Sequence, residues 1–305
     1  MPLPFKHLTS TIQLSRKDTD SILGAAGKME KVLEKGGNDL LKGKILAALF
    51  YEPSTRTRLS FEAAMHRLGG SVISAVGMQF SSMYKGETIE DTMQVIGRYA
   101  DIIAMRHPEK GSADKAAAAC PVPFINAGDG PSQHPTQGLL DLFTIKKERG
   151  KLDGIHIAMA GDLKFGRTVH SLSFLLGLYD GVRFTLVSPE ELKMPEKVTK
   201  FFDEKGIKYV QTERLEEGLG ADVLYITRVQ GERFEDKAEF ERLKLKYILK
   251  KEHVENRDIT VMHPLPRVGE IDTGVDSLPN AAYFRQVRNG IPLRMALLAM
   301  LLEKA

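Results

Sequence analysis

The chain has 305 residues, 42% of them hydrophobic and 27% charged, and it is long enough for two domains of about 150 residues each. Its 43 basic and 40 acidic side chains leave a formal charge of +3, which argues against a nucleic-acid surface. Cys120 is the only cysteine, which excludes an intrachain disulfide and a thiolate metal cluster. Without a leader pattern or a membrane-length apolar stretch, we expect a cytoplasmic protein that does not contact a membrane.

The first half alternates short apolar runs with segments of helical period, after an opening amphipathic helix at 16–33. We predict strands at 45–51, 71–76, 101–106 and 122–126. Helices are predicted at 57–68, 88–99, 112–119 and 136–149. This alternation is typical of parallel βαβ units.

The second half repeats this alternation after a charged, glycine-containing stretch at 146–154, which suits a domain boundary. Strands are predicted at 155–160, 183–187, 208–211, 223–227 and 259–262, and helices near 166–178, 196–204, 237–243 and 250–254. A last helix, at 291–303, follows Gly290. The sequence therefore predicts an α/β fold of two doubly wound parallel-sheet domains, with the active site in the cleft between them.

The segment 51–62 places hydroxyls and guanidinium groups in a strand-to-helix turn. Unpaired N–H groups and the helix dipole favour an anion at such a turn. Ser54, Thr55 and Thr57 add hydroxyl donors, and Arg56 adds a fork suited to phosphate oxygens. An N-capped helix with a solvated first turn is the alternative. We interpret the segment as a phosphate-binding site.

Three more polar clusters follow strands of the first half. Lys85 lies in a loop beside Gly86, Arg106 ends the third strand, and His134 precedes Gln137 at the start of a helix. Each has an ordinary alternative: a solvated lysine, a surface ion pair and a structural histidine. Because a helix N-terminus lowers a histidine pKa, we expect His134 to be neutral and to donate to a carbonyl oxygen.

The strand ends of the second half carry anion-binding side chains. Arg167 falls in the first turn of a helix, where the dipole disfavours a cation, which suggests a compensating ligand anion. Arg228 and Gln230 are two residues apart and project to one side of an extended segment. Two arginine sites suit the two carboxylates of one small substrate. The alternate prolines of 263–267 suggest carbonyls held toward the cleft and permit a cis bond.

These motifs occur in one order over nearly the whole chain and together resemble the catalytic chains of the aspartate carbamoyltransferase family. They are Ser54–Arg58, the Lys85 loop, Arg106–Pro108, His134–Gln137, Arg167, Arg228–Gln230 and His263–Pro266. The resemblance implies transfer of a carbamoyl group from carbamoyl phosphate to L-aspartate in pyrimidine synthesis. It implies a carbamoyl phosphate-binding domain at 1–134, completed by a C-terminal helix at 285–305, and an aspartate-binding domain at 135–284.

The resemblance also assigns roles to the motif residues. Residues 54–57 and Arg106 would bind the phosphate, and Thr55, Arg106 and His134 would stabilise the developing oxyanion. The amide and amino groups would be held by Gln137 and by the backbone carbonyls of Pro264 and Leu265. Arg167 would bind the α-carboxylate of aspartate, and Arg228 and Gln230 would bind its β-carboxylate. We expect no cofactor and no metal.

Family members form trimers with active sites between neighbouring chains. By resemblance this chain is a homotrimer in which Ser81 and Lys85 come from the adjacent subunit. Glu52 would pair with Arg167 and Arg233 when the domains close. Whether a separate regulatory chain binds stays open.

Three alternatives differ in class or substrate. Ornithine carbamoyltransferases share the phosphate motif but usually carry Cys-Leu-Pro near the end, where this chain has His263–Pro266, and Arg228 with Gln230 suits a carboxylate better than an ammonium. A non-catalytic binding protein of the same fold would be favoured by loss of the charged motif residues, which are present. The third alternative, an NAD-dependent oxidoreductase, is weakly supported because the segment 161–171 lacks the G-x-G-x-x-G fingerprint.

Overall fold

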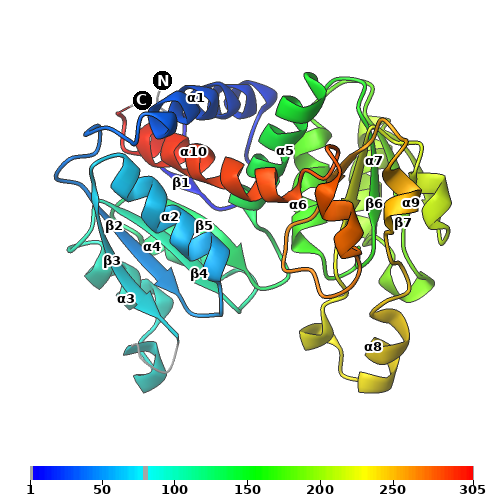
Figure 1. Cartoon of the computed structure of the whole chain (residues 1–305). Helices are drawn as coiled ribbons and strands as arrows, with labels where there is room; N and C mark the ends of the chain where they lie inside the picture. Colours follow the sequence, from blue (N-terminus) through cyan, green and yellow to red (C-terminus); the bar gives the residue numbers. More distant parts are fainter. Residues whose placement is uncertain (1–2, 78–81, 305) are drawn as a thin grey trace. The chain divides into compact units, whose positions relative to one another are not determined.

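A computed structural model describes residues 3–77 and 82–304 of the chain. It divides into two compact units, one made of residues 1–140 with 288–305 and the other of residues 141–287. Each unit contains one five-stranded parallel sheet (Figure 1). The prediction of an α/β protein with two parallel-sheet domains is confirmed.

The sheet of the first unit has the order β1-β5-β4-β2-β3. Its strands are β1 (His7–Leu8), β2 (Ile45–Phe50), β3 (Ser71–Val76), β4 (Ile102–His107) and β5 (Phe124–Asp129). The helices of this unit are α1 (Arg16–Glu34), α2 (Thr55–Arg67), α3 (Ile89–Ile96) and α4 (Ser112–Ala119), with a 3-10 helix at Ser82–Lys85. Two further helices, α5 (Pro135–Arg149) and α10 (Tyr283–Leu301), contain the points where the chain passes from one unit to the other.

The side chains of each strand point alternately to the two faces of this sheet, and both faces are covered by helices. Ala47 and Leu49 of β2 point to one face, where they pack with Met93 of α3 and Ala116 of α4. The intervening residues of β2 are also buried, and α2 packs against β2 and β3 (Figure 1). Strands buried on both faces read as continuous apolar runs, which is why β2 and β4 could be predicted from sequence.

The sheet of the second unit has the order β10-β9-β6-β7-β8. Its strands are β6 (His156–Ala160), β7 (Arg183–Val187), β8 (Lys208–Thr212), β9 (Val223–Ile226) and β10 (Thr260–Met262). The helices are α6 (Arg167–Leu176), α7 (Glu196–Lys205), α8 (Lys237–Leu243) and α9 (Lys251–Val254), with 3-10 turns at Glu190–Leu192, Leu215–Gly218, Gly231–Arg233 and Thr273–Ser277.

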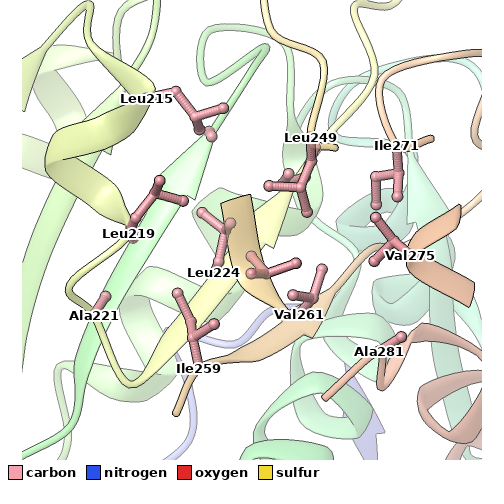
Figure 2. Packing of buried hydrophobic residues seen from close by; sticks show 14 of the residues in the cluster. Leu215, Leu219, Ala221, Leu224, Leu249, Ile259, Val261, Ile271, Val275 and Ala281 are labelled. Atoms are coloured by element: carbon pink, nitrogen blue, oxygen red, sulfur yellow. The ribbon is translucent and has the colours of Figure 1, made fainter. Parts of the chain in front are cut away.

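One face of this sheet packs on an aliphatic cluster drawn from distant parts of the chain (Figure 2). Leu224 of β9 and Val261 of β10 are register partners in neighbouring strands. Leu215, Leu249 and Val275 pack with them from outside the sheet, and all three are buried. The cluster thereby fixes the ends of β9 and β10, from which two of the predicted site segments begin.

Most predicted elements begin or end within a few residues of the observed ones, with two exceptions. The short strand β1 was not predicted, because two residues carry no usable period. The last helix begins at Tyr283, close to the start at 285 that the resemblance implies and well before 291, and it continues through Gly290 and Pro292. At Gly290 an added Cβ would lie 2.5 Å from Nη1 of Arg294, so the glycine leaves room for that buried side chain.

Both sheets have a topological switch point at their centre. In the first sheet the chain runs from β2 outward to β3 and then returns to β4 on the other side of β2. In the second it runs from β6 to β7 and β8 and then returns to β9 beside β6. Ligands of open α/β sheets bind beyond the carboxyl ends of strands at such points. The fold therefore singles out the ends of β2 with β4, and of β6 with β9.

Candidate functional site

Arg106, at the end of β4, is held by two residues that follow β2. Its Nε donates to Oε1 of Glu52 at 2.5 Å, and its Nη1 donates to Oγ of Ser54 at 3.1 Å. The Arg106 side chain is 16% exposed and that of Glu52 is 17% exposed. The switch point of the first sheet thus holds a largely desolvated, oriented guanidinium beside the predicted phosphate-binding segment.

The N-terminus of α2 lies in this same segment. In the described part of the chain, Ser54 occupies the N-cap position without a side-chain capping bond, and the first turn contains no acidic residue. At α1, by contrast, Ser15 and Asp18 form a complete capping box. Thr55 and Arg56 are exposed, so the amide end of α2 has the composition expected of an anion-binding helix terminus.

His134 is brought to α2 by the turn between β5 and α5. Its side chain is 4% exposed, and Nε2 lies 3.4 Å from Oγ1 of Thr57. The turn is organised by the buried Asp129, which accepts from the backbone N–H groups of Gln133 and Gly111. Burial raises the pKa of Asp129, against these hydrogen bonds and one from Asn126. The predicted donation from His134 to a substrate carbonyl stays a prediction.

The remaining predicted residues of the first unit are less closely joined. Gln137 lies in the first turn of α5 and is half-buried. Lys85 ends the 3-10 helix before α3 and is exposed. Ser81 lies outside the described residues. The structure therefore joins Arg106 to Ser54 and Thr57 to His134, both at the first turn of α2.

At the switch point of the second sheet, the buried Asp162 ties two predicted site segments together. Its Oδ1 accepts from the N–H of Phe165 at 2.9 Å, and its Oδ2 accepts from the N–H of Gln230 at 3.2 Å. Burial raises the pKa of Asp162, and these hydrogen bonds and Arg228 oppose that shift. Sequence reasoning did not single out Asp162; an acid directly after Gly161 at a strand end was the available signal.

Arg167 and Arg228 lie on the two segments that Asp162 joins. Arg167 begins α6, as predicted, and is half-buried. Arg228 makes a bidentate ion pair with Glu232, in which Nη1 donates to Oε2 at 3.0 Å and Nη2 donates to Oε1. This pair raises the pKa of Arg228, so the guanidinium stays charged. Glu232 was not anticipated, although its spacing of four residues from Arg228 was visible.

The segment after β10 has a constrained backbone. The Leu265–Pro266 bond is cis, as the sequence had permitted, and Leu265 has φ 54°. Residues other than glycine rarely adopt this conformation, and it persists where surrounding contacts impose it. Nδ1 of the buried His263 accepts from the N–H of Leu265 at 2.8 Å. That the carbonyls of Pro264 and Leu265 face a substrate stays a prediction.

Within the described residues, no group of three or more His, Cys, Asp or Glu side chains is placed to hold a metal ion. No helix in that part of the chain is both long and apolar enough to cross a membrane. Cys120 is buried, and burial raises the pKa of its thiol.

Comparison with known proteins decides the family. The model for the "aspartate/ornithine carbamoyltransferase, carbamoyl-P binding domain" matches residues 6–147, and that for the "Asp/Orn binding domain" matches residues 153–301. The chain belongs to the aspartate/ornithine carbamoyltransferase family. It is 52% identical over 300 residues to the aspartate carbamoyltransferase catalytic subunit of Methanocaldococcus jannaschii, covering 98% of each chain. To that of Leptospira biflexa it is 52% identical over 298 residues, or 97% of this chain and 96% of the relative.

Solved structures of family members have the same fold. The catalytic subunit of M. jannaschii aspartate transcarbamoylase superposes with a TM-score of 0.92 at 52% identity and covers 98% of both chains. The Trypanosoma cruzi aspartate transcarbamoylase, in complex with carbamoyl phosphate and aspartate, superposes with a TM-score of 0.91 at 42% identity over 96% of each chain.

Proposed function

We propose that this chain transfers the carbamoyl group of carbamoyl phosphate to the amino group of L-aspartate, giving N-carbamoyl-L-aspartate and phosphate. The observation that carries the proposal is the pair of switch points, each with an oriented arginine: Arg106 in the first unit and Arg228 in the second. Similarity to aspartate carbamoyltransferase catalytic subunits over 98% of the chain supports the same reaction.

Carbamoyl phosphate is bound by the first unit in this proposal. Its phosphate lies at the N-terminus of α2, where amide groups, the hydroxyls of Ser54, Thr55 and Thr57, and Arg56 satisfy its oxygens. Arg106 contacts both the phosphate and the carbamoyl oxygen. His134, beside Thr57, donates to the same carbamoyl oxygen. Groups fixed before the substrate arrives stabilise the oxyanion without reorganising during the reaction.

Aspartate is bound by the second unit. Arg167 takes its α-carboxylate, and Arg228 with Gln230 takes its β-carboxylate. The backbone carbonyls of Pro264 and Leu265, with Gln137, hold the amino and amide groups. Because Asp162 joins the Arg167 and Gln230 segments, the two carboxylate sites keep a fixed separation. Two guanidinium groups suit the two carboxylates of aspartate better than the side-chain ammonium of ornithine.

The reaction then needs little beyond positioning and charge stabilisation. The aspartate nitrogen attacks the carbamoyl carbon, a C–N bond forms, and the bond from that carbon to the phosphate oxygen breaks. The leaving phosphate takes the proton released by the amine. This route needs no dedicated protein base.

The test is turnover of carbamoyl phosphate with L-aspartate, L-ornithine or no acceptor, with phosphate and the ureido product both measured. We expect stoichiometric formation of both products with aspartate alone. Turnover with ornithine only would contradict the roles of Arg228 and Gln230. Phosphate release without a ureido product would contradict carbamoyl transfer.

The active site is completed by a second copy of the chain, in a homotrimer. β3 is an edge strand with exposed Ile73 and Val76, and exposed apolar side chains also lie on α2 and α3, among them Leu59 and Val95. An edge strand with apolar side chains is typical of a covered surface. Lys85, on the loop between β3 and α3, is proposed to act in the neighbouring subunit's site.

Subunit mixing tests the shared site. Arg56→Ala and Lys85→Ala chains should each be inactive alone, and mixed trimers should regain activity because some sites receive neither substitution. A matched control mixes Arg56→Ala with His134→Ala, two residues of the same subunit's site. That mixture should recover none, and equal recovery in both mixtures would contradict the interchain role of Lys85.

A further inference from the structure

A buried chain of hydrogen bonds in the second unit ends at the segment after β10. Tyr225 of β9 donates its O–H to Oδ2 of Asp141 at 2.7 Å. Gln286 donates from Nε2 to Oδ1 of Asp141 at 2.6 Å, and its Oε1 accepts from the N–H of His263 at 2.9 Å. None of these four side chains is more than 1% exposed.

The side chain of His263 extends this series of hydrogen bonds to Leu265 and Glu270, in the segment that follows β10. Its Nδ1 accepts from the N–H of Leu265, so Nε2 bears the hydrogen and donates to Oε1 of Glu270 at 2.7 Å. Oε2 of Glu270 in turn accepts from the N–H of Val268 at 2.9 Å. Burial alone would raise the pKa of Glu270, but its hydrogen bonds outweigh burial and lower it.

The geometry points to Gln286 as a positioning residue for the reaction: it fixes the backbone of Pro264 and Leu265, and through it the aspartate amino group. This inference rests on the proposed function, which assigns those carbonyls to the substrates. Gln286 lies on α10, Asp141 on α5 and Tyr225 on β9, so three regular elements set its place. A loop held by such elements keeps its position better than one held by its own residues.

The two hydrogen-bond partners of residue 286 also explain why it is a glutamine. Asp141 accepts and therefore needs a donor, whereas the N–H of His263 needs an acceptor. An uncharged amide supplies both at once, which a carboxylate or an aliphatic side chain does not. Without Gln286, Oδ1 of Asp141 and the N–H of His263 would each lose a buried hydrogen bond. A φ of 54° at Leu265 would then lose the support that reaches it through His263.

A polarity exchange tests this inference. Gln286→Glu sets two carboxylates against each other, so the pair must bind a proton, and the loss of activity should deepen as pH rises. In Gln286→Glu/Asp141→Asn, the new glutamate accepts from His263 N and from the asparagine Nδ2. The asparagine Oδ1 then accepts from Tyr225, so all three hydrogen bonds and one negative charge return.

We expect kcat/KM for aspartate to fall about tenfold or more in Gln286→Glu at pH 8 and to return to within about threefold of the original in the double variant. Inhibition by inorganic phosphate, which binds the first unit, should stay unchanged in both. Gln286→Met removes both hydrogen bonds without introducing repulsion, so its kcat/KM for aspartate should be about tenfold lower at every pH. This variant replaces Gln286→Glu in the test if Gln286→Glu does not fold. Phe202→Leu, in the core of the same unit, is the control for instability alone: it should lower the unfolding temperature and leave kcat/KM unchanged.

Each result decides between the two proposals. An original chain without aspartate turnover overturns the proposed function and this inference with it. An active original chain with unchanged kcat/KM in Gln286→Met and Gln286→Glu overturns the positioning role alone. A double variant that regains stability but stays as slow as Gln286→Glu also overturns it.

Discussion

The two switch points hold their arginines in different ways. Arg106 is paired with Glu52 where both side chains are less than one-fifth exposed, next to the N-terminus of α2. Arg228 is paired with Glu232, whose side chain is 54% exposed, on a segment held through its backbone by Asp162. The first site is therefore built on regular elements, whereas the second is built on loops that buried acids hold in place. The first arrangement suits a site that is formed before its ligand arrives. In the second, the exposed Glu232 orients Arg228 before aspartate binds.

The largest expected effect comes from breaking the more buried pair. Arg106→Ala should lower kcat by about 10²–10³-fold, because an oriented oxyanion donor is lost. It also leaves Glu52 largely buried without this partner, so the unfolding temperature should fall. Steady-state kinetics and thermal unfolding measure the two effects. Lys44→Ala, which breaks the ion pair with Asp101 in the same unit, is the matched control. Equal kcat in both variants would contradict a direct role for Arg106.

A smaller effect is expected where the pair is exposed. Glu232→Ala leaves Arg228 charged but without its bidentate partner, so the guanidinium must be ordered when aspartate binds. KM for aspartate should rise by about three- to tenfold, with KM for carbamoyl phosphate unchanged. Lys246→Ala, which breaks the ion pair with Glu213 elsewhere in the unit, is the control. A fall in KM for aspartate would show that Glu232 competes with the substrate and does not orient Arg228.

The smallest effect concerns acid stability of the second unit. Burial lowers the pKa of His263, against an opposing contribution from Glu270. The unfolded chain binds a proton near pH 6.5, whereas the folded chain binds it only at lower pH. Stability is therefore retained above about pH 6.5 and falls as pH drops below it, by about 1.4 kcal/mol per pH unit until the folded group titrates.

Denaturant unfolding between pH 7.5 and 5.5 measures this slope. His263→Asn keeps an acceptor for Leu265 but binds no proton, so its stability should fall less steeply than that of the original chain. His170→Gln is the matched control, because burial also lowers the pKa of His170. Nε2 of His170 contacts the backbone oxygen of Leu163, in the segment before α6. This control variant should flatten the slope while leaving turnover unchanged. Parallel slopes for His263→Asn and the original chain would contradict the neutral His263.

The sequence identified the arginines of the candidate site but not the buried acidic residues that hold its loops. Arg106 and Arg228 stood out because charged side chains rarely end buried apolar strands. Arg167 stood out because the helix dipole disfavours a cation in the first turn. Asp162 and Glu270 act by accepting backbone N–H groups of loops, and a sequence does not distinguish such acids from solvated ones. The same limit applies to Gln286, whose partners at 141 and 263 are distant in the chain.

The elements show the same division between local and long-range information. The buried strands were predicted closely because their apolar runs are local signals. The residue pattern placed the start of α10 at 291 because Gly290 and Pro292 are local breakers, whereas the resemblance implied a start at 285. The packing of this helix comes from elsewhere in the fold, including Arg294 over the ring of Phe61. Tertiary packing outweighed intrinsic propensity at that position.

The central claim is that each unit binds its own substrate. Calorimetric titration of carbamoyl phosphate into Arg56→Ala and Arg228→Ala chains tests it most directly. We expect binding to be lost in Arg56→Ala and to stay close to that of the original chain in Arg228→Ala. Equal loss in both variants, or loss in Arg228→Ala alone, would contradict it.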